Sequence, residues 1–173
     1  MNTTGLKQIV AALAMTATFA SFNVHAAGAR FNHQNAAGGI TAGAAHSGAN
    51  TNGNFASGHG VVTDGAGNGE AVSGGVVTTT NGGSAERAGK TTVSSDGSAN
   101  HTSGFSASGT QGSVTSQGSA TKSADGTLTQ NRTSSATGAN GSYEGSTSYS
   151  KESGVSHTGS CTNASGQAVS CPR

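Results

Sequence analysis

The bulky apolar residues of this chain recur at a fixed distance from glycine, with small and polar residues between them. The phrase NGSYEG (140–145) returns in related forms as QGSVT (111–115) and DGTLT (125–129). Successive copies begin 14 to 16 residues apart, except for a last interval of 18. A fixed period of this kind is the signature of a repeat architecture. The glycines that open the copies, which we expect in turns, are Gly38, Gly53, Gly69, Gly83, Gly97, Gly112, Gly126, Gly141 and Gly159.

The position two residues after each of these glycines holds many of the scarce bulky side chains. We therefore expect this position to set the register between repeats, as one column of side chains. Its occupants are Ile40, Phe55, Ala71, Ala85, Ala99, Val114, Leu128, Tyr143 and Cys161.

Within each copy the pattern is typical of short strands. Asn, Asp or Gln usually precedes the opening glycine, and Asn-Gly and Asp-Gly favour tight turns between strands. A second small or glycine turn is expected about six residues later, and segments rich in Val and Thr, such as VVTTT (76–80), follow it. Branched side chains of this kind favour strands. The sequence thus predicts an all-β fold of strand-turn-strand units with strands of about five residues. The second turns are expected at Gly75, Gly89, Gly104, Gly118 and Gly166.

Such units can stack in two ways. In a β-solenoid or amyloid-like stack each unit is one coil, and the bulky position forms a thin interior ladder. In an antiparallel meander the turns are hairpins. The single bulky column favours the solenoid, whereas the Asn-Gly and Asp-Gly pairs favour the meander. A largely disordered Gly/Ser/Thr coil is the remaining alternative.

Composition excludes an ordinary globular core. From residue 27 onward the strongly apolar residues are three Phe, one Ile, one Leu and nine Val. Backbone hydrogen bonds and ladders of Ser, Thr and Asn side chains would have to replace the missing apolar core.

The first residues resemble a secretory signal peptide over residues 1–26, with one Lys, an apolar run and small residues around Val24 and Ala26. The run is shorter than the roughly 20 residues of a membrane span. We therefore expect an exported protein, periplasmic or extracellular, without a membrane span. Residues 27–37 are expected to form a flexible arm, and residues 38–173 the β-repeat region with a disulfide-closed last unit, 159–173.

The charges from residue 27 onward balance, with seven basic and seven acidic residues. A chain without positive excess has no overall attraction to nucleic acid or to an anionic membrane. We expect neither partner.

Two cysteines, Cys161 and Cys171, stand in the last unit. In an exported protein an even number of cysteines indicates a disulfide, and the turn at Asn163–Gly166 would bring the two residues together. The expected bridge staples the C-terminal end of the repeats.

No motif predicts catalysis, a metal or a cofactor. AGKTT (88–92) lacks the glycine spacing of a phosphate-binding loop, and DGAGNG (64–69) lacks oxygen ligands of a calcium loop. Thr78 and Thr80, like Thr127 and Thr129, form isolated Thr-x-Thr pairs. The five histidines from residue 27 onward have no ligand spacing: His33, His46, His59, His101 and His157.

The segment DGAGNGEAV (64–72), with the strand-turn-strand repeat behind a signal peptide, resembles the repeats of curli-type major subunits. The resemblance implies a secreted bacterial protein that stacks into extracellular functional amyloid. We expect a non-enzymatic structural subunit that binds copies of itself by β-strand templating, forming a filament, matrix or surface layer, with extracellular polysaccharide as a further partner. The alternatives are a secreted binding module for ice or polysaccharide and a disordered spacer.

Overall fold

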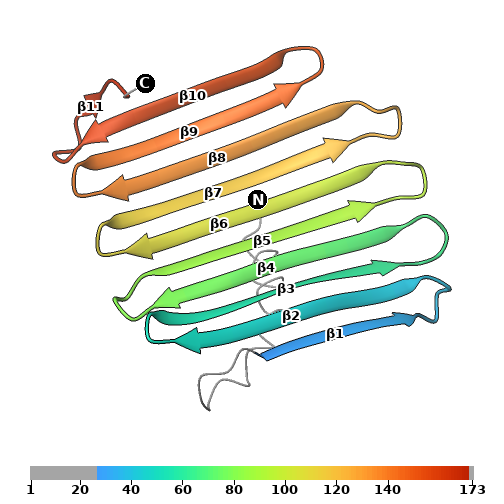
Figure 1. Cartoon of the computed structure of the whole chain (residues 1–173). Coiled ribbons are helices and arrows are strands. Elements are labelled where there is room, and N and C mark those ends of the chain that lie inside the picture. The colour runs from blue at the N-terminus through green and yellow to red at the C-terminus, as the bar shows by residue number, and fades with distance from the viewer. Residues whose placement is uncertain (1–26, 172–173) are drawn as a thin grey trace.

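The protein forms one antiparallel sheet in which every strand pairs with its neighbours in chain order (Figure 1). The computed structural model describes residues 27–171. Its strands are β1 (Ala27–Gln34), β2 (Ile40–Asn50), β3 (Gly53–Thr63), β4 (Gly69–Thr79), β5 (Ser84–Val93), β6 (Ala99–Gly109), β7 (Gly112–Lys122), β8 (Leu128–Gly138), β9 (Gly141–Ser150), β10 (Gly154–Asn163) and β11 (Ala168–Val169). The sheet does not close, so β1 lies at one edge and β10 with β11 at the other.

The all-β prediction is confirmed, and the arrangement is the antiparallel meander rather than the solenoid. Every strand pair is antiparallel and is joined by a turn of two to five residues. Turns this short can only reverse the chain, because parallel neighbours need a crossover of a dozen or more residues. The Asn-Gly and Asp-Gly pairs therefore decide the topology.

Each repeat is one long strand, and the prediction of two short strands per repeat was wrong. The strands β2 to β10 are 10 or 11 residues long. The glycines expected in second turns at Gly75, Gly89, Gly104 and Gly118 lie inside β4, β5, β6 and β7. A glycine that follows no turn-forming Asn or Asp is compatible with extended backbone, where it leaves room for side chains of neighbouring strands.

The prediction of a flexible arm over residues 27–37 was also wrong. Residues 27–34 form β1, which pairs with β2 from Ala27 opposite Ser47 to Gln34 opposite Ile40. The ring of Phe31 lies over Gly43 and fills the space that a side chain there would occupy. The expected signal peptide, residues 1–26, lies outside the described residues.

Nearly all side chains of the described residues are in contact with water. Cys161, at 9% exposure, is the one buried apolar side chain, and no side chain is fully buried. Backbone pairing across ten strand interfaces therefore holds the sheet together.

Short turns lie along one lateral margin of the sheet. Gly53, Gly112 and Gly141 follow two-residue turns there with φ between 134° and 148°. A Cβ atom on any of them would overlap a carbonyl oxygen of the next strand. Only glycine fits these three positions.

Longer turns lie mainly along the opposite margin, where Asx side chains hold the backbone. Asp64 Oδ1 accepts hydrogen bonds from the N–H groups of Ala66 (2.8 Å) and Asn68 (3.0 Å). Asp96 and Asp125 each accept one from the backbone two residues on, at 2.8 Å. Asn35 Oδ1 does the same in the first turn, with donors Ala37 and Gly39 at 3.1 Å.

Six of the nine predicted turn glycines have positive φ: Gly38, Gly53, Gly97, Gly112, Gly126 and Gly141. Gly69 begins β4, and Gly83 ends a turn whose positive φ falls on Gly82. Gly159 lies inside β10, which runs between turns at Gly154 and Gly166. The turn assignment at Gly159 was therefore wrong, because the last interval of 18 residues breaks the period.

The two kinds of turn predict different costs for the same substitution. Gly126→Ala should cost about 1 to 2 kcal/mol, the cost of left-handed backbone, since nothing lies within 4 Å of the new Cβ. Gly112→Ala should cost about 3 kcal/mol, because its Cβ meets the Thr137 carbonyl and two strands must move apart. Urea unfolding followed by circular dichroism measures both, and equal midpoints would contradict the assignment.

Acid should weaken the sheet through its turns. Hydrogen bonds from the Asn68 side chain and from backbone N–H groups lower the pKa of Asp64. The Ser98 and Thr127 donors likewise lower the pKa values of Asp96 and Asp125. A lowered folded-state pKa adds stability above about pH 4, which is lost as the pH falls through the folded value.

The triple variant Asp64→Asn, Asp96→Asn, Asp125→Asn supplies the control. Asn35 shows that an Asn side chain can hold the same kind of turn. The variant should therefore lose less stability than the unchanged protein between pH 5 and pH 2, measured as the urea midpoint. An identical loss would place the acid sensitivity elsewhere.

Candidate functional site

The pairing register aligns side chains into straight columns that cross the strands. In an antiparallel sheet, directly opposite residues point to the same face and successive residues to opposite faces. The nine predicted register residues all lie on one face under this rule. They do not form one column, because neighbouring strands run in opposite directions. The register position, two residues after the glycine, therefore lies near one lateral margin in one strand and near the other margin in the next.

One set of register residues forms a continuous apolar column near the short turns. Phe55 in β3 opposes Val77 in β4, and the pairing continues to Cys161 in β10 and Val169 in β11. The apolar column consists of Phe55, Val77, Ala85, Ala107, Val114, Ala136, Tyr143, Cys161 and Val169. The remaining register residues lie toward the long turns on the same face: Ile40, Ala71, Ala99 and Leu128.

This face also collects most of the basic side chains, so we call it the basic face. Its cations belong to β1, β5, β7 and β8, and four of the five histidines among residues 27–171 accompany them. Every carboxylate among residues 27–171 lies on the opposite face or in a turn. The basic residues of this face are Arg30, Arg87, Lys122 and Arg132, and its histidines are His46, His59, His101 and His157.

The opposite face, here called the hydroxyl face, carries Glu70, Glu86 and Glu144. From β6 to β10 every one of its positions is Ser, Thr, Asn, Gln, Glu or Gly. Hydroxyls of neighbouring strands are hydrogen bonded, as between Ser113 and Thr137 at 2.8 Å. A shallow depression of about 570 Å³ lies here, and its polar lining includes Thr115, Gln117, Thr133, Ser135, Glu144 and Thr158.

The histidines of the basic face bind hydroxyls across the strands. His101 Nδ1 lies 2.8 Å from Thr91 Oγ1, and His157 Nδ1 lies 2.8 Å from Thr147 Oγ1. It was not predicted from the sequence that these histidines share one face. The alternation of side chains along each strand, combined with the correct turn positions, would have revealed it. His33 lies on the hydroxyl face, beside Phe31.

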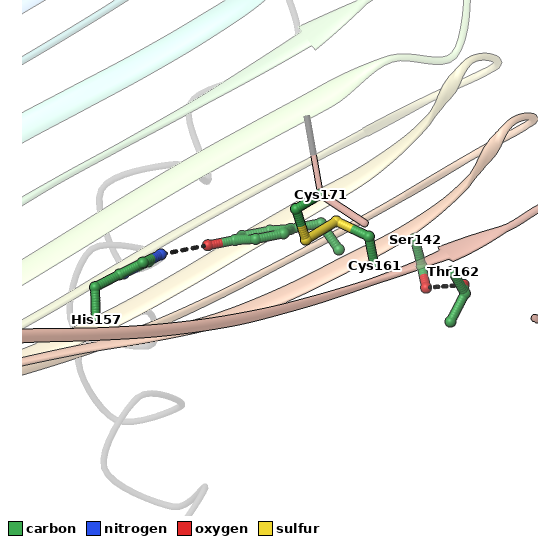
Figure 2. Close-up of a disulfide and its surroundings, with 6 residues drawn as sticks. Ser142, His157, Cys161, Thr162 and Cys171 are labelled. Atoms are coloured by element: carbon green, nitrogen blue, oxygen red, sulfur yellow. Dashed lines mark hydrogen bonds between the residues drawn. A yellow bond between two sulfur atoms is a disulfide. The ribbon is translucent and has the colours of Figure 1, made fainter. Parts of the chain in front are cut away.

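The predicted disulfide between Cys161 and Cys171 is confirmed, with Cα atoms 5.3 Å apart (Figure 2). It fastens the short strand β11 and the following residues to the end of β10. Tyr143 lies beside it across the strands, fills the space over Gly145, and contacts His157 Nε2 at 3.4 Å. Ser142 and Thr162 are hydrogen bonded to each other on the hydroxyl face. Figure 2 shows this pair close to the cystine.

Both edges of the sheet expose unpaired backbone. Among residues 27–171, nothing pairs with the outer edge of β1. At the other edge, β11 pairs only with Cys161 and Thr162, which leaves residues 154–160 of β10 open. Because ten long strands alternate in direction, β1 and β10 run antiparallel to each other.

The other motifs take structural places. Lys90 of AGKTT lies in β5 and forms an ion pair with Glu70 at 2.7 Å. In DGAGNG, the Asp64 carboxylate is held by its own turn. Thr78 and Thr129 lie on strands of the hydroxyl face, whereas Thr80 and Thr127 lie in turns, so the Thr-x-Thr pairs form no array.

No group of three or more His, Cys, Asp or Glu side chains in the described part of the chain is arranged to hold a metal ion. Nor does that part contain a helix that could cross a membrane. No family model, curated protein or solved structure matches this chain.

Reduction of the disulfide should loosen one corner of the sheet and leave the rest intact. β11 has only two paired residues, so without the bridge its ordering has little support. Hydrogen exchange should become fast at Ala168 and Val169 after reduction, while protection in β3 to β8 stays unchanged. The double variant Cys161→Ser, Cys171→Ser should show the same exchange with or without reductant. Protection of β11 in that variant would contradict this role.

Proposed function

We propose that the protein is an exported, non-enzymatic structural subunit that assembles by continuing its meander from copy to copy. The observation that carries the proposal is the pair of open, oppositely directed edges formed by β1 and β10. Exposed edges present N–H and C=O groups that add further strands by main-chain hydrogen bonding.

The even number of long strands makes this addition geometrically simple. When β1 of an incoming copy pairs with residues 154–160 of β10, the antiparallel alternation continues without turning the copy over. All copies then keep the same face on the same side. An interface between two different surfaces that does not close into a ring generates an open filament.

The cystine makes the two edges unequal. It holds β11 over the end of β10 near Cys161 and Thr162, so an incoming strand finds seven open residues there, 154–160. The eight residues of β1 carry no such cover within the described chain. Elongation would therefore depend on the redox state of the cystine.

Two features of the sequence support the extracellular setting. Residues 1–26 have the pattern of a secretory signal, and a cystine persists in oxidising compartments. The repeat and the segment 64–72 resemble curli-type subunits, whose known assembly into extracellular fibres agrees with the proposal.

A second candidate function is a polysaccharide-binding module. The depression on the hydroxyl face favours it, since its hydroxyls and the Glu144 carboxylate can exchange hydrogen bonds with sugar hydroxyls. This function requires only one copy of the chain, so a stable monomer that binds neutral glycan would favour it.

Electron microscopy of the purified protein after incubation tests the assembly. Proline removes one N–H group, and successive N–H groups of a strand point in opposite directions. Val155→Pro and Ser156→Pro therefore remove donors on opposite sides of β10. One of them removes an N–H group that points to the open edge, and the other removes an N–H group that points toward β9. We expect the edge variant to abolish filaments at an almost unchanged urea midpoint, and the other variant to lower that midpoint.

The cystine provides a second readout. Filament growth should accelerate on reduction, and the double variant Cys161→Ser, Cys171→Ser should grow at the accelerated rate with or without reductant. A protein that stays monomeric at high concentration would overturn the proposal, as would filaments from both proline variants equal to those of the unchanged protein.

A further inference from the structure

We propose that the basic face binds a linear anionic polysaccharide, laid across the strands over the three arginines. The proposal stands apart from assembly, because one copy carries the whole surface. Its basis is the separation of charge between the two faces, which the balanced net charge of the sequence conceals.

Among the strands that the structure describes, the carboxylates are confined to the hydroxyl face, and every strand cation except Lys90 lies on the basic face. The basic face carries Arg30, Arg87, Lys122 and Arg132 and no carboxylate. The hydroxyl face carries three glutamates and one lysine, Lys90, which is paired with Glu70. That ion pair is the one found in the described chain, so the cations of the basic face have no acidic partner of their own. A surface of one sign attracts a partner of the opposite sign and repels others.

The arginines lie along one path. Two adjacent columns in the middle of the basic face hold all three, in β1, β5 and β8. At about 4.8 Å per strand, they are spaced roughly 19 and 14 Å apart along a line that crosses the strands. Most other positions of these columns are Gly, Ser, Thr or Ala, so Arg30 and Arg132 stand among short side chains, whereas Arg87 lies opposite Phe105. The two columns also contain His46, His59, His157 and Phe105.

Arg132 is held in place for such a contact. Its Nη1 donates a hydrogen bond to Ser116 Oγ at 2.8 Å, and its guanidinium lies over Gly118. Both residues belong to the neighbouring strand β7. A guanidinium has five N–H donors, so the remaining donors are available to a carboxylate or sulfate. Positioning by Ser116 and Gly118 reduces the side-chain entropy that binding would otherwise remove.

Aromatic rings beside this path lie against the sheet. Phe55 covers Gly48, and Tyr143 covers Gly145 and Gly159. Phe55 remains 39% exposed. Rings held flat on a surface offer an apolar face to which the C–H groups of a sugar ring can pack, at low entropic cost. An anionic polysaccharide supplies both kinds of group, charged substituents and apolar sugar faces.

Other occupants fit less well. A second basic face would bring eight cations together without a carboxylate. The hydroxyl face of another copy would set polar columns against the apolar column. Nucleic acid carries one charge per about 1.7 Å of duplex, whereas these arginines are roughly 14 to 19 Å apart. A polysaccharide with one charge on each sugar, or on alternate sugars, needs fewer cations.

The test measures binding of three polymers of similar length at low salt by isothermal titration calorimetry: a polyuronate, neutral dextran and single-stranded DNA. The protein carries the filament-blocking proline of β10, so that binding is measured on single copies and a failure of assembly does not affect the result. We expect the polyuronate to bind, with affinity falling as salt rises, and dextran to bind at least tenfold more weakly.

Two variants of equal charge separate the basic face from general electrostatics. Arg87→Gln with Arg132→Gln removes two charges from the path and should weaken polyuronate binding at least tenfold. Lys90→Gln with Lys151→Gln removes two charges from the hydroxyl face and a turn, and should change it less than twofold. Circular dichroism checks that both variants fold.

The proposal would be overturned by no binding of polyuronate at low salt, by equal weakening by the two double variants, or by binding of dextran as tight as that of polyuronate. Tighter binding of single-stranded DNA than of polyuronate would also overturn it and would assign the basic face to nucleic acid.

Discussion

The hydrogen-bond ladder between neighbouring strands is the interaction on which the rest of this structure depends. In ordinary globular proteins a buried apolar core selects the fold, but here Cys161 is the one buried apolar side chain of the described chain. Backbone groups pair across ten interfaces, and strands of 10 or 11 residues make the eight interfaces from β2 to β10 long. Because the ladder is indifferent to side-chain identity, both faces are free to carry side chains chosen for other reasons.

The side chains nevertheless support the ladder from its surfaces. Aromatic rings cover cross-strand glycines, as Phe31 covers Gly43 and Phe55 covers Gly48. Such packing shields backbone hydrogen bonds that glycine would leave open to water. On the hydroxyl face, cross-strand Ser and Thr pairs contribute hydrogen bonds that add modestly to each interface. The glycines inside strands thus serve two purposes: they admit the large side chains of neighbouring strands and keep the sheet thin.

Much of the fold was predictable, because local signals control it. The Asn-Gly and Asp-Gly turns, the Val and Thr strands and the two cysteines predicted the all-β fold, most turn positions and the disulfide. The mid-strand glycines misled, since glycine alone does not distinguish a turn from a strand that lies under a neighbour's side chain.

β1 was missed because it precedes the first copy of the repeat. Its pairing with β2 depends on contact between two segments, which no local pattern in residues 27–34 indicates. The two faces were missed for a related reason: the solenoid interpretation places every register residue in one column, whereas reversal of the chain at each turn divides them between two margins.

The alternation of side chains within each strand also determines which changes in length the protein can accept. Inserting one residue into a strand would move every side chain beyond it to the other face of the sheet. Arginines would then lie on the hydroxyl face, and hydroxyl side chains on the basic face. Removing or adding a complete hairpin preserves both faces. The interval from Gly97 to Gly126, like that from Gly112 to Gly141, is 29 residues, which is one such hairpin. A gene encoding this protein could therefore lengthen or shorten in steps of about 29 codons and still specify a sheet with the same two surfaces.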